Sequence, residues 1–377
     1  MKFIYHASPN LRQKLSTKRI MLELMIALCA VYVFTLFYYY TRYDLERMLQ
    51  AVMLLAVSLG TALLTEGVWA LCTKQPVLRY LSSSFGWITA MILTLMCTIN
   101  TPPFAIGVAT FCAIFFGKLL FGGFGQNIFN PAAMGRAVIF ACFAGATTDA
   151  ITGATPTTVM ANTYNWLPTT SASFDALLER VGSIWDLFIG WYPGAMGETC
   201  TALLLIIGVI LAIRKVIDWR VPLIYLMTVA LMALVLGLCA GVEELWLYVA
   251  FHLCSGGVMF GAVFMLTDPV TSPTAAQGRV IFALGAGILS MLIRVKANLP
   301  EGVLYSILLM NMLTPLIERA LDGQQVRMRK KAYTITAVLA VLGIALAALL
   351  GNVMESAEEK AESLALAAET TTVQEVL

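Results

Sequence analysis

The sequence predicts an all-α polytopic membrane protein with about ten or eleven transmembrane helices. Hydrophobic residues make up 59% of the 377-residue chain and charged residues only 12%, whereas a soluble domain carries about 25% charged residues. The mean hydropathy is +0.82. Apolar runs of about 20 residues recur along the chain, and a run of that length crosses the bilayer core as a helix.

Each expected span is an apolar run bounded by polar residues, glycine or proline. The spans lie near residues 20–40, 48–72, 85–101, 103–121, 131–147, 194–213, 221–241, 245–266, 280–296, 300–318 and 333–351. The expected order of segments is a basic leader, a first membrane unit, a polar loop, a second membrane unit, a basic loop with an extra C-terminal membrane helix, and an acidic tail. In that order the segments cover residues 1–19, 20–147, 148–193, 194–320, 321–351 and 352–377.

The distribution of lysine and arginine predicts a cytoplasmic N-terminus, because cytoplasmic loops carry the excess of positive charge. After the basic leader, the basic loops are those that hold Lys74, Arg79, Arg214, Lys215, Arg220, Arg327, Arg329, Lys330 and Lys331. This orientation places residues 148–193 on the extracytoplasmic side. No cleavable signal peptide is expected, since the first apolar run is too long for one and lacks a small-residue cleavage site.

Two polar interruptions of the apolar pattern resemble each other. One runs from Leu120 to Arg136 and the other from Phe264 to Arg279, and both end in A-A-x-G-R followed by V-I-F. This similarity predicts an internally duplicated core with broken helices, a common plan in membrane transporters. A chance match is the alternative, because the chain is rich in alanine and glycine.

Three acidic residues lie within or beside apolar spans, at Glu66, Glu198 and Asp268. A carboxylate at the centre of a membrane helix costs about 2.5–3.5 kcal/mol, so such residues usually face a partner or a polar path. We therefore consider them candidates for a cation or proton path, with structural ion pairs as the alternative. The candidate cationic partners are Lys118, Arg136 and Arg279. Asp268, before a proline, also fits a helix-capping turn.

The cysteines and histidines do not predict a zinc site, an iron–sulfur cluster within this chain or a haem. The eight cysteines occur singly with no C-x-x-C pair, whereas zinc and iron–sulfur sites need grouped thiolates. A cluster shared between single cysteines of two subunits stays open as an alternative. Two histidines, His6 and His252, do not support a haem with two histidine ligands, and the net charge of +2 indicates no nucleic-acid partner.

The most specific motif is the D-A-I-T-G-A-T segment from Asp149 to Thr155. It resembles the D-x-x-[S/T]-G-A-[T/S] motif at which flavin mononucleotide (FMN) is esterified through its phosphate to the last hydroxyl, here that of Thr155. In that reading Asp149 and Thr152 contact the flavin transferase that attaches the group, and Gly153 and Ala154 leave room for it. The alternative is an ordinary solvated turn.

Further strings extend the resemblance over most of residues 1–320. G-G-x-G-x-N-x-F-N-P-A from Gly122, P-G-A-M-G-E-T from Pro193 and the segment from Ser255 to Pro273 resemble the D subunit of the Rnf ion-translocating oxidoreductase and its relative, the B subunit of the sodium-pumping NADH:quinone oxidoreductase. The resemblance implies that a second flavin, riboflavin, binds without a covalent bond. The residues expected to hold it are Gly122, Gly123, Asn127 and Asn130. Glycines needed only for helix packing are the alternative.

The resemblance implies a membrane electron-transfer subunit of a ferredoxin:NAD⁺ oxidoreductase in the bacterial inner membrane, which is not catalytic alone and whose complex exports Na⁺ or H⁺. Its expected partners are the other subunits of the complex, including a second FMN-bearing subunit and cluster-bearing membrane subunits, together with the transferase and membrane lipid. The length and short leader favour the Rnf D subunit over the subunit of the quinone reductase. The alternatives are that quinone-reductase component and a non-redox transporter or channel of similar fold.

Overall fold

The computed structural model describes residues 16–143, 155–198, 200–297, 302–323 and 325–354, and the regular structure within these ranges is entirely helical. The elements are α1 (Thr17–Arg42), α2 (Leu45–Cys72), α3 (Val77–Ser84), α4 (Gly86–Met96), α5 (Pro103–Ile114), η1 (Phe115–Leu119), α6 (Pro131–Cys142), α7 (Pro156–Tyr164), α8 (Ser171–Val181), α9 (Ile184–Ile189), α10 (Thr201–Ile213), α11 (Arg220–Cys239), α12 (Leu245–Cys254), α13 (Val258–Phe260), η3 (Gly261–Met265), α14 (Ala276–Lys296), α15 (Gly302–Ala320) and α16 (Gln325–Val353). Most of the expected leader and the expected acidic tail lie outside the described residues.

Every apolar run predicted to cross the membrane corresponds to a helix or a bent pair of helices. Within the described residues, six helices are long and apolar enough to span, namely α1, α2, α11, α14, α15 and α16. The run at 245–266 is broken, with α12 and α13–η3 bent by 58°. The remaining four runs form the shorter apolar helices α4, α5–η1, α6 and α10. The predicted polytopic all-α fold with broken helices is confirmed.

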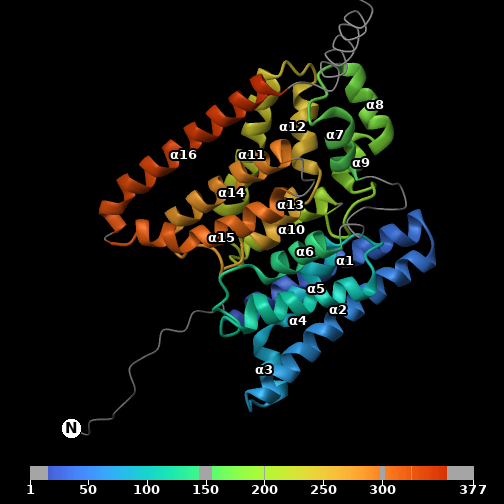
Figure 1. The fold of residues 1–377 in the computed structure, drawn as a ribbon, viewed down its shortest axis with the longest axis vertical. Helices are drawn as coiled ribbons and strands as arrows, with labels where there is room; N and C mark the ends of the chain where they lie inside the picture. The colour runs from blue at the N-terminus through green and yellow to red at the C-terminus, as the bar shows by residue number, and fades with distance from the viewer. Residues whose placement is uncertain (1–15, 144–154, 199, 298–301, 324, 355–377) are drawn as a thin grey trace, which may run out of the picture.

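The helices form two packed groups. In the first group, α2 contacts α1, α4 and α5, and α6 contacts α4 and α5. In the second, α11 and α14 pack against each other and both contact α16, while α15 lies along α14. Figure 1 shows the first group below the second, with α7, α8 and α9 gathered at one end near α12. The groups meet where α15 packs on α6 and where Asn130 N donates to Asn311 Oδ1 at 3.0 Å.

The two similar interruptions adopt the same succession of local structures. Each begins within or just after a five-residue π-helix, η1 or η3, and each ends inside the helix that carries the shared string, α6 or α14. The π-turns close through backbone hydrogen bonds from Leu120 N to Phe115 O at 3.1 Å and from Leu266 N to Gly261 O at 2.9 Å. This local correspondence supports the duplicated core expected from the sequence.

The segment expected to be a polar loop, residues 148–193, contains three short helices, α7, α8 and α9. Their N-caps are Thr155, Thr170 and Ser183, whose side chains accept hydrogen bonds from backbone N–H groups of the first turn. Serine and threonine are strong helix-start residues. They are also typical of loops, and the loop prediction for this segment therefore missed the three helices.

Gly135 lies where three helices of the first group approach most closely. An added Cβ would lie 2.9 Å from atoms of each of Leu93, Ala109 and Ala113. We expect Gly135→Ala to destabilise the fold by about 1–3 kcal/mol, because overpacking forces neighbouring atoms apart. The measurement is the melting temperature of the purified chain in detergent.

Gly60→Ala on α2 is the matched control, because nothing lies within 4 Å of its added Cβ. This variant should melt at or slightly above the parental temperature. If Gly135→Ala melted together with it, the close packing of α4, α5 and α6 would be contradicted.

Candidate functional site

Thr155, the expected flavin acceptor, is the N-cap of α7. Its backbone is extended, its side chain is half-buried, and Oγ1 accepts a hydrogen bond from Thr158 N at 3.4 Å. The hydroxyls of Thr157 and Thr158 lie 3.0 and 3.1 Å from Oγ1. A helix N-terminus carries N–H groups without intrahelical partners and a partial positive charge, so it favours a phosphate group. The other motif residues, Asp149, Thr152, Gly153 and Ala154, lie outside the described residues.

The first turn of α7 lies against the break between α12 and α13. A Cβ on Gly256 would be only 2.5 Å from Thr157 Cγ2, so the two segments are in direct contact. Gly256 and Gly257 both have positive φ, 65° and 69°, which glycine adopts without steric cost. Thr157, two residues after the expected acceptor Thr155, therefore contacts the broken membrane helix.

Arg294 of α14 holds this break together. Its guanidinium donates to the carbonyl oxygens of His252 at 3.0 Å, Ser255 at 3.1 Å and Gly256 at 2.9 Å. The residue is only 1% exposed. The carbonyls freed by the break thus find a cationic donor inside the protein, as backbone groups at membrane depth require.

Glu198, one of the three expected acids, lies at the same break. A Cβ on Gly257 would be 2.6 Å from Glu198 Oε1, so the carboxylate packs directly on the glycine. Arg294 was not among the cationic partners expected from the sequence, although it is buried at this break and reaches Gly256 O. The structure therefore places Glu198 at the glycine pair that the first turn of α7 contacts.

Sequence reasoning also missed an aromatic group beneath α7. His252 is fully buried, with its ring stacked on Trp166 at a centroid distance of 5.7 Å and against Tyr248 at 4.6 Å. Tyr248 OH donates to Trp166 O at 3.1 Å, and the Arg294 guanidinium lies 5.7 Å from the Trp166 ring. These contacts fix the chain just after α7, and a single histidine in an apolar run was the only sequence signal for them.

A cavity at the other end of the bundle joins the two interruptions. Residues from both repeats line it, among them Lys118, Phe124, Asn127, Asn130, Thr267 and Asp268. Three of the expected site residues, Asn127, Asn130 and Asp268, therefore come together although they are far apart in sequence.

The expected glycines shape the loop beside this cavity. Gly122 and Gly123 have φ of 115° and 98°, and neither lines the cavity. A Cβ on Gly122 would lie 2.0 Å from Gln126 Oε1. The amide of Gly123 donates to Lys118 O at 3.0 Å. These glycines let the chain turn back sharply after η1, and the neighbouring asparagines reach the cavity instead.

The two asparagines differ in what their side chains do. Asn130 caps α6, because its Oδ1 accepts from Ala132 N at 3.0 Å and Ala133 N at 3.3 Å, and its Nδ2 donates to Met265 O at 3.4 Å. Asn127 donates from Nδ2 to Phe129 O at 3.0 Å. Asn130 is thus a structural link between the repeats, and Asn127 is the better candidate for contact with a bound molecule.

Glu66 and Lys118, one of the three candidate cationic partners, form a buried ion pair beside the cavity. Lys118 Nζ lies 2.8 Å from Glu66 Oε1, and the two side chains are 3% and 0% exposed. Ser84 Oγ donates to the same carboxylate oxygen at 2.6 Å, and Lys118 also donates to Ser84 O. Lys118 lines the cavity, with its Nζ 5.9 Å from the Phe124 ring. Lys118 therefore lies in the cavity wall with its charge compensated by Glu66.

Asp268 forms a turn, although it does not cap a helix. Its carboxylate accepts from Val270 N at 3.1 Å and from Thr271 Oγ1 at 3.3 Å, and α14 begins only at Ala276. Arg279 pairs instead with Asp218, at 2.9 Å. The three expected acids are therefore divided, with Glu66 and Asp268 near the cavity and Glu198 near α7.

The Glu66–Lys118 pair allows a direct test of burial. We expect Glu66→Gln or Lys118→Met to cost about 3–5 kcal/mol each, because each leaves the opposite charge buried without its partner. The double variant should recover most of that loss. The measurement is the free energy of unfolding in detergent.

Asp218→Asn is the control, because the Asp218–Arg279 pair is partly exposed, at 18% and 30%. Its loss should cost no more than about 1 kcal/mol. A double variant as unstable as the sum of the singles would argue against coupling between Glu66 and Lys118.

The profile of the NQR2, RnfD, RnfE family matches residues 4–327, a range that includes α1 to α15 and ends just after α16 begins. The D subunit of the proton-translocating ferredoxin:NAD(+) oxidoreductase complex of Clostridium ljungdahlii is 34% identical over 328 residues, covering 84% of this chain and 94% of that protein.

Two other relatives are similar over most of their length. The D subunit of the Na(+)-translocating ferredoxin:NAD(+) oxidoreductase complex of Acetobacterium woodii is 36% identical, covering 83% of this chain and 92% of that protein. The D subunit of the ion-translocating oxidoreductase complex of Stutzerimonas stutzeri is 34% identical, covering 71% and 82%. Because the family profile matches residues 4–327, from the leader to the start of α16, the chain belongs to the NQR2, RnfD, RnfE family.

Proposed function

We propose that this chain is the D subunit of an ion-translocating ferredoxin:NAD⁺ oxidoreductase, an Rnf complex, in a bacterial inner membrane. Family membership and the names of its relatives support this assignment. The chain is an electron-transfer component that works only with the other subunits, including a second FMN-bearing subunit and cluster-bearing membrane subunits. The relative in Clostridium ljungdahlii is named for protons and that in Acetobacterium woodii for sodium, so the exported ion is one of these two.

We further propose that FMN is bound to Thr155 by a phosphoester. The observation that carries this proposal is the position of the Thr155 hydroxyl at the N-cap of a nine-residue helix. There the phosphate would meet the first backbone N–H groups and the positive end of the helix dipole. The residues present fit the group, because Thr155 is half-buried and therefore partly accessible to a transferase. When bound, the flavin supplies the redox chemistry.

The cavity between the repeats is the proposed site of the second flavin, riboflavin. Phe85, Phe124 and Phe264 supply apolar wall, and Asn127 and Lys118 supply polar groups. Mostly apolar walls with a few polar groups are typical of cofactor sites. The Asn127 amide would orient the ring by hydrogen bonding.

The basic loops support an orientation in which the cavity faces the cytoplasm and Thr155 the extracytoplasmic side. In this arrangement, the start of α1 and the loops at 120–130 and 214–219 lie at the cytoplasmic end. The helices α7, α8 and α9 lie at the opposite end. The two flavins would then stand at opposite ends of the bundle, as an electron path across the membrane requires.

Two alternatives remain testable. The B subunit of the quinone reductase belongs to the same family, but relatives at 34–36% identity over most of the chain are named as components of ferredoxin:NAD(+) oxidoreductases. A non-redox transporter would carry no flavin. The path for the ion through Glu66, Glu198 and Asp268 remains our proposal, with Glu66 and Asp268 near the cytoplasmic end and Glu198 near α7.

Covalent flavin can be tested directly. We expect the chain, expressed with its flavin transferase, to give a fluorescent band under ultraviolet light after denaturing electrophoresis. Thr155→Ala should abolish the band, because the esterified hydroxyl is missing. Thr170→Ala is the matched control, since Thr170 is also a threonine N-cap, that of α8, and its band should stay bright. A dark parental band, with a transferase that labels a control substrate, would exclude covalent flavin and favour the transporter.

The orientation predicts which residues react with a membrane-impermeant maleimide in intact cells. We expect Trp185→Cys on α9 to be labelled from outside, because Trp185 is 72% exposed. Arg79→Cys on α3 should react only after the membrane is permeabilised. The reverse pattern would overturn the orientation, and the native cysteines are separated from the new sites by peptide-resolved mass spectrometry.

A further inference from the structure

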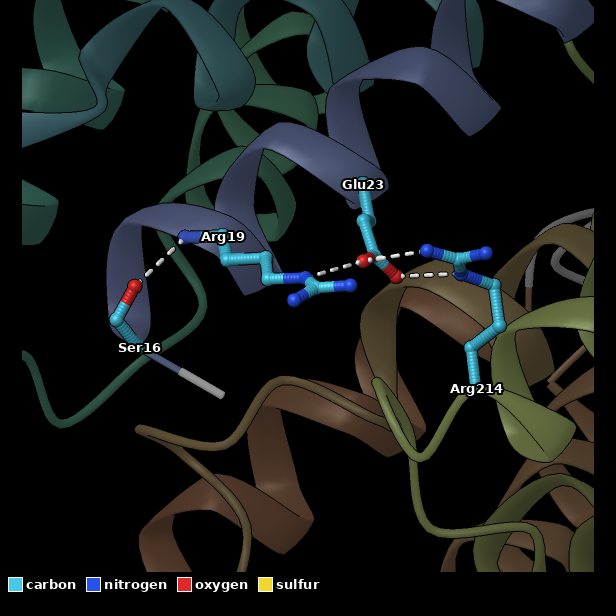
Figure 2. Close-up of polar contacts among 4 residues, drawn as sticks. All are labelled: Ser16, Arg19, Glu23 and Arg214. Atoms are coloured by element: carbon cyan, nitrogen blue, oxygen red, sulfur yellow. Dashed lines mark hydrogen bonds and ion pairs between the residues drawn. The ribbon is translucent and has the colours of Figure 1, made fainter. Parts of the chain in front are cut away.

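An ion pair links the beginning of α1 to the end of α10. Figure 2 shows the carboxylate of Glu23 between the side chains of Arg214 and Arg19. Arg214 donates twice, from Nε to Glu23 Oε2 and from Nη2 to Oε1, both at 2.8 Å. Arg19 Nε donates to Oε1 at 3.1 Å, and Ser16 caps the helix by accepting from Arg19 N.

The geometry of this contact distinguishes it from an ordinary surface ion pair. Exposed pairs contribute little unless their geometry is favourable, and two parallel hydrogen bonds between guanidinium and carboxylate are the favourable case. The Glu23 side chain is only 10% exposed, although that of Arg214 is 51% exposed. The carboxylate is therefore sheltered and held by both arginines.

Arg214 is set in place by the turn that ends α10. Lys215 N donates to Ala212 O at 3.0 Å and Val216 N to Leu211 O at 2.9 Å. Lys215 has φ of 58°. This is the hydrogen-bond pattern of a Schellman motif, which reverses the chain direction after a helix. The turn fixes the position of Arg214 relative to Val216 and Ile217.

The residues beside both partners are walls of the proposed riboflavin cavity. On α1, Ile20, Met21 and Leu24 line the cavity, and after Arg214 so do Val216 and Ile217. The ion pair thus ties together two walls that come from different halves of the chain, 191 residues apart in sequence. Loss of the pair would remove the polar link between those walls, although α1 and α10 also pack against each other.

We propose that Glu23 and Arg214 are positioning residues that keep the cavity closed around its non-covalent flavin. This inference rests on the proposed second flavin. A flat and largely uncharged ring is retained mainly by the walls that enclose it, so the rate of its release depends on how often those walls separate. The covalently bound FMN has no such dependence, because its phosphoester holds it to the chain.

The first test compares riboflavin release from the purified full-length chain and from variants of the pair. Glu23→Gln and Arg214→Gln should each release riboflavin roughly fivefold faster, the change expected for a favourable but partly exposed ion pair. Release is followed by chromatography of free flavin after dilution, and the fluorescent FMN band should keep its parental intensity. Arg214→Lys, which keeps the charge and loses the double hydrogen bond, should lie between.

Charge reversal provides the rescue. In an Arg19→Gln background, which removes a nearby positive charge, Glu23→Arg and Arg214→Glu should each speed release, and the two together should restore the rate of that background. Glu243→Gln is the matched control. Glu243 also bridges two elements, accepting from Ser171 N at 2.8 Å and Oγ at 2.9 Å, but it lies beside α8 and should leave release unchanged.

A second readout does not need flavin. Thr89 lines the cavity, so Thr89→Cys reports its accessibility to a maleimide by site-resolved mass spectrometry. Labelling of Thr89→Cys should be severalfold faster in the Glu23→Gln background than in the Glu243→Gln background. The melting temperatures of the two proteins are compared, so that faster labelling is not mistaken for general unfolding. If Glu23→Gln does not fold, Arg214→Lys carries the same comparison.

The outcomes separate the two proposals. A parental chain that binds riboflavin, with variants that release it and label Thr89→Cys at parental rates, would overturn the role of the pair alone. A parental chain that binds no riboflavin would overturn the second-flavin proposal and, with it, this use of the pair. Faster release reversed by the charge swap would support both.

Discussion

The breaks in the membrane helices depend on polar groups that satisfy the freed backbone. Hydrocarbon offers no hydrogen bonds, so an interrupted helix at membrane depth is stable only where the protein supplies partners. Arg294 does this for three carbonyls at the α12–α13 break. Asn130 does it at the start of α6. The backbone N–H groups of Met196 and Gly197 do it for the carbonyls of Cys97 and Leu95 at the end of α4.

This constraint explains why the candidate sites coincide with the breaks. A break brings glycines, exposed backbone and buried charge together, and these are also the features that a cofactor site needs. The α7 helix, with Thr155 at its start, stands on the α12–α13 break. The cavity lies where the two repeats, each with its π-helix and polar interruption, face each other. The same polar groups thus serve both the fold and the proposed flavin sites.

The two ion pairs beside the cavity differ in how far they are exposed. Glu66 and Lys118 neutralise each other next to the cavity, whereas Glu23 and Arg214 bridge α1 and α10 at its edge. The helix α16 begins where the family match ends. It packs on α11 and α14 without an ion pair among the described contacts, through close approaches at Gly343 and Gly351. Small residues permit such contacts between membrane helices.

Local properties of the sequence determined most of the fold. Hydropathy located each of the described apolar helices because the length and composition of a run are local properties of the sequence. The repeated A-A-x-G-R string located the duplicated element. The motif ending at Thr155 pointed to the proposed acceptor, and the pairing of Glu66 with Lys118 was among the expected partners. The three helices α7, α8 and α9 were missed because their polar composition resembles that of a loop.

Only the tertiary structure decided how distant residues combine. It placed both asparagines at the cavity and made one of them, Asn130, the cap of α6. It paired Arg279 with Asp218 and placed Arg294 and His252 at the α12–α13 break that α7 contacts. It joined Glu23 to Arg214 across 191 residues. These pairings depend on the packing of whole helices, since residues far apart in sequence become neighbours only when the helices that carry them are in contact.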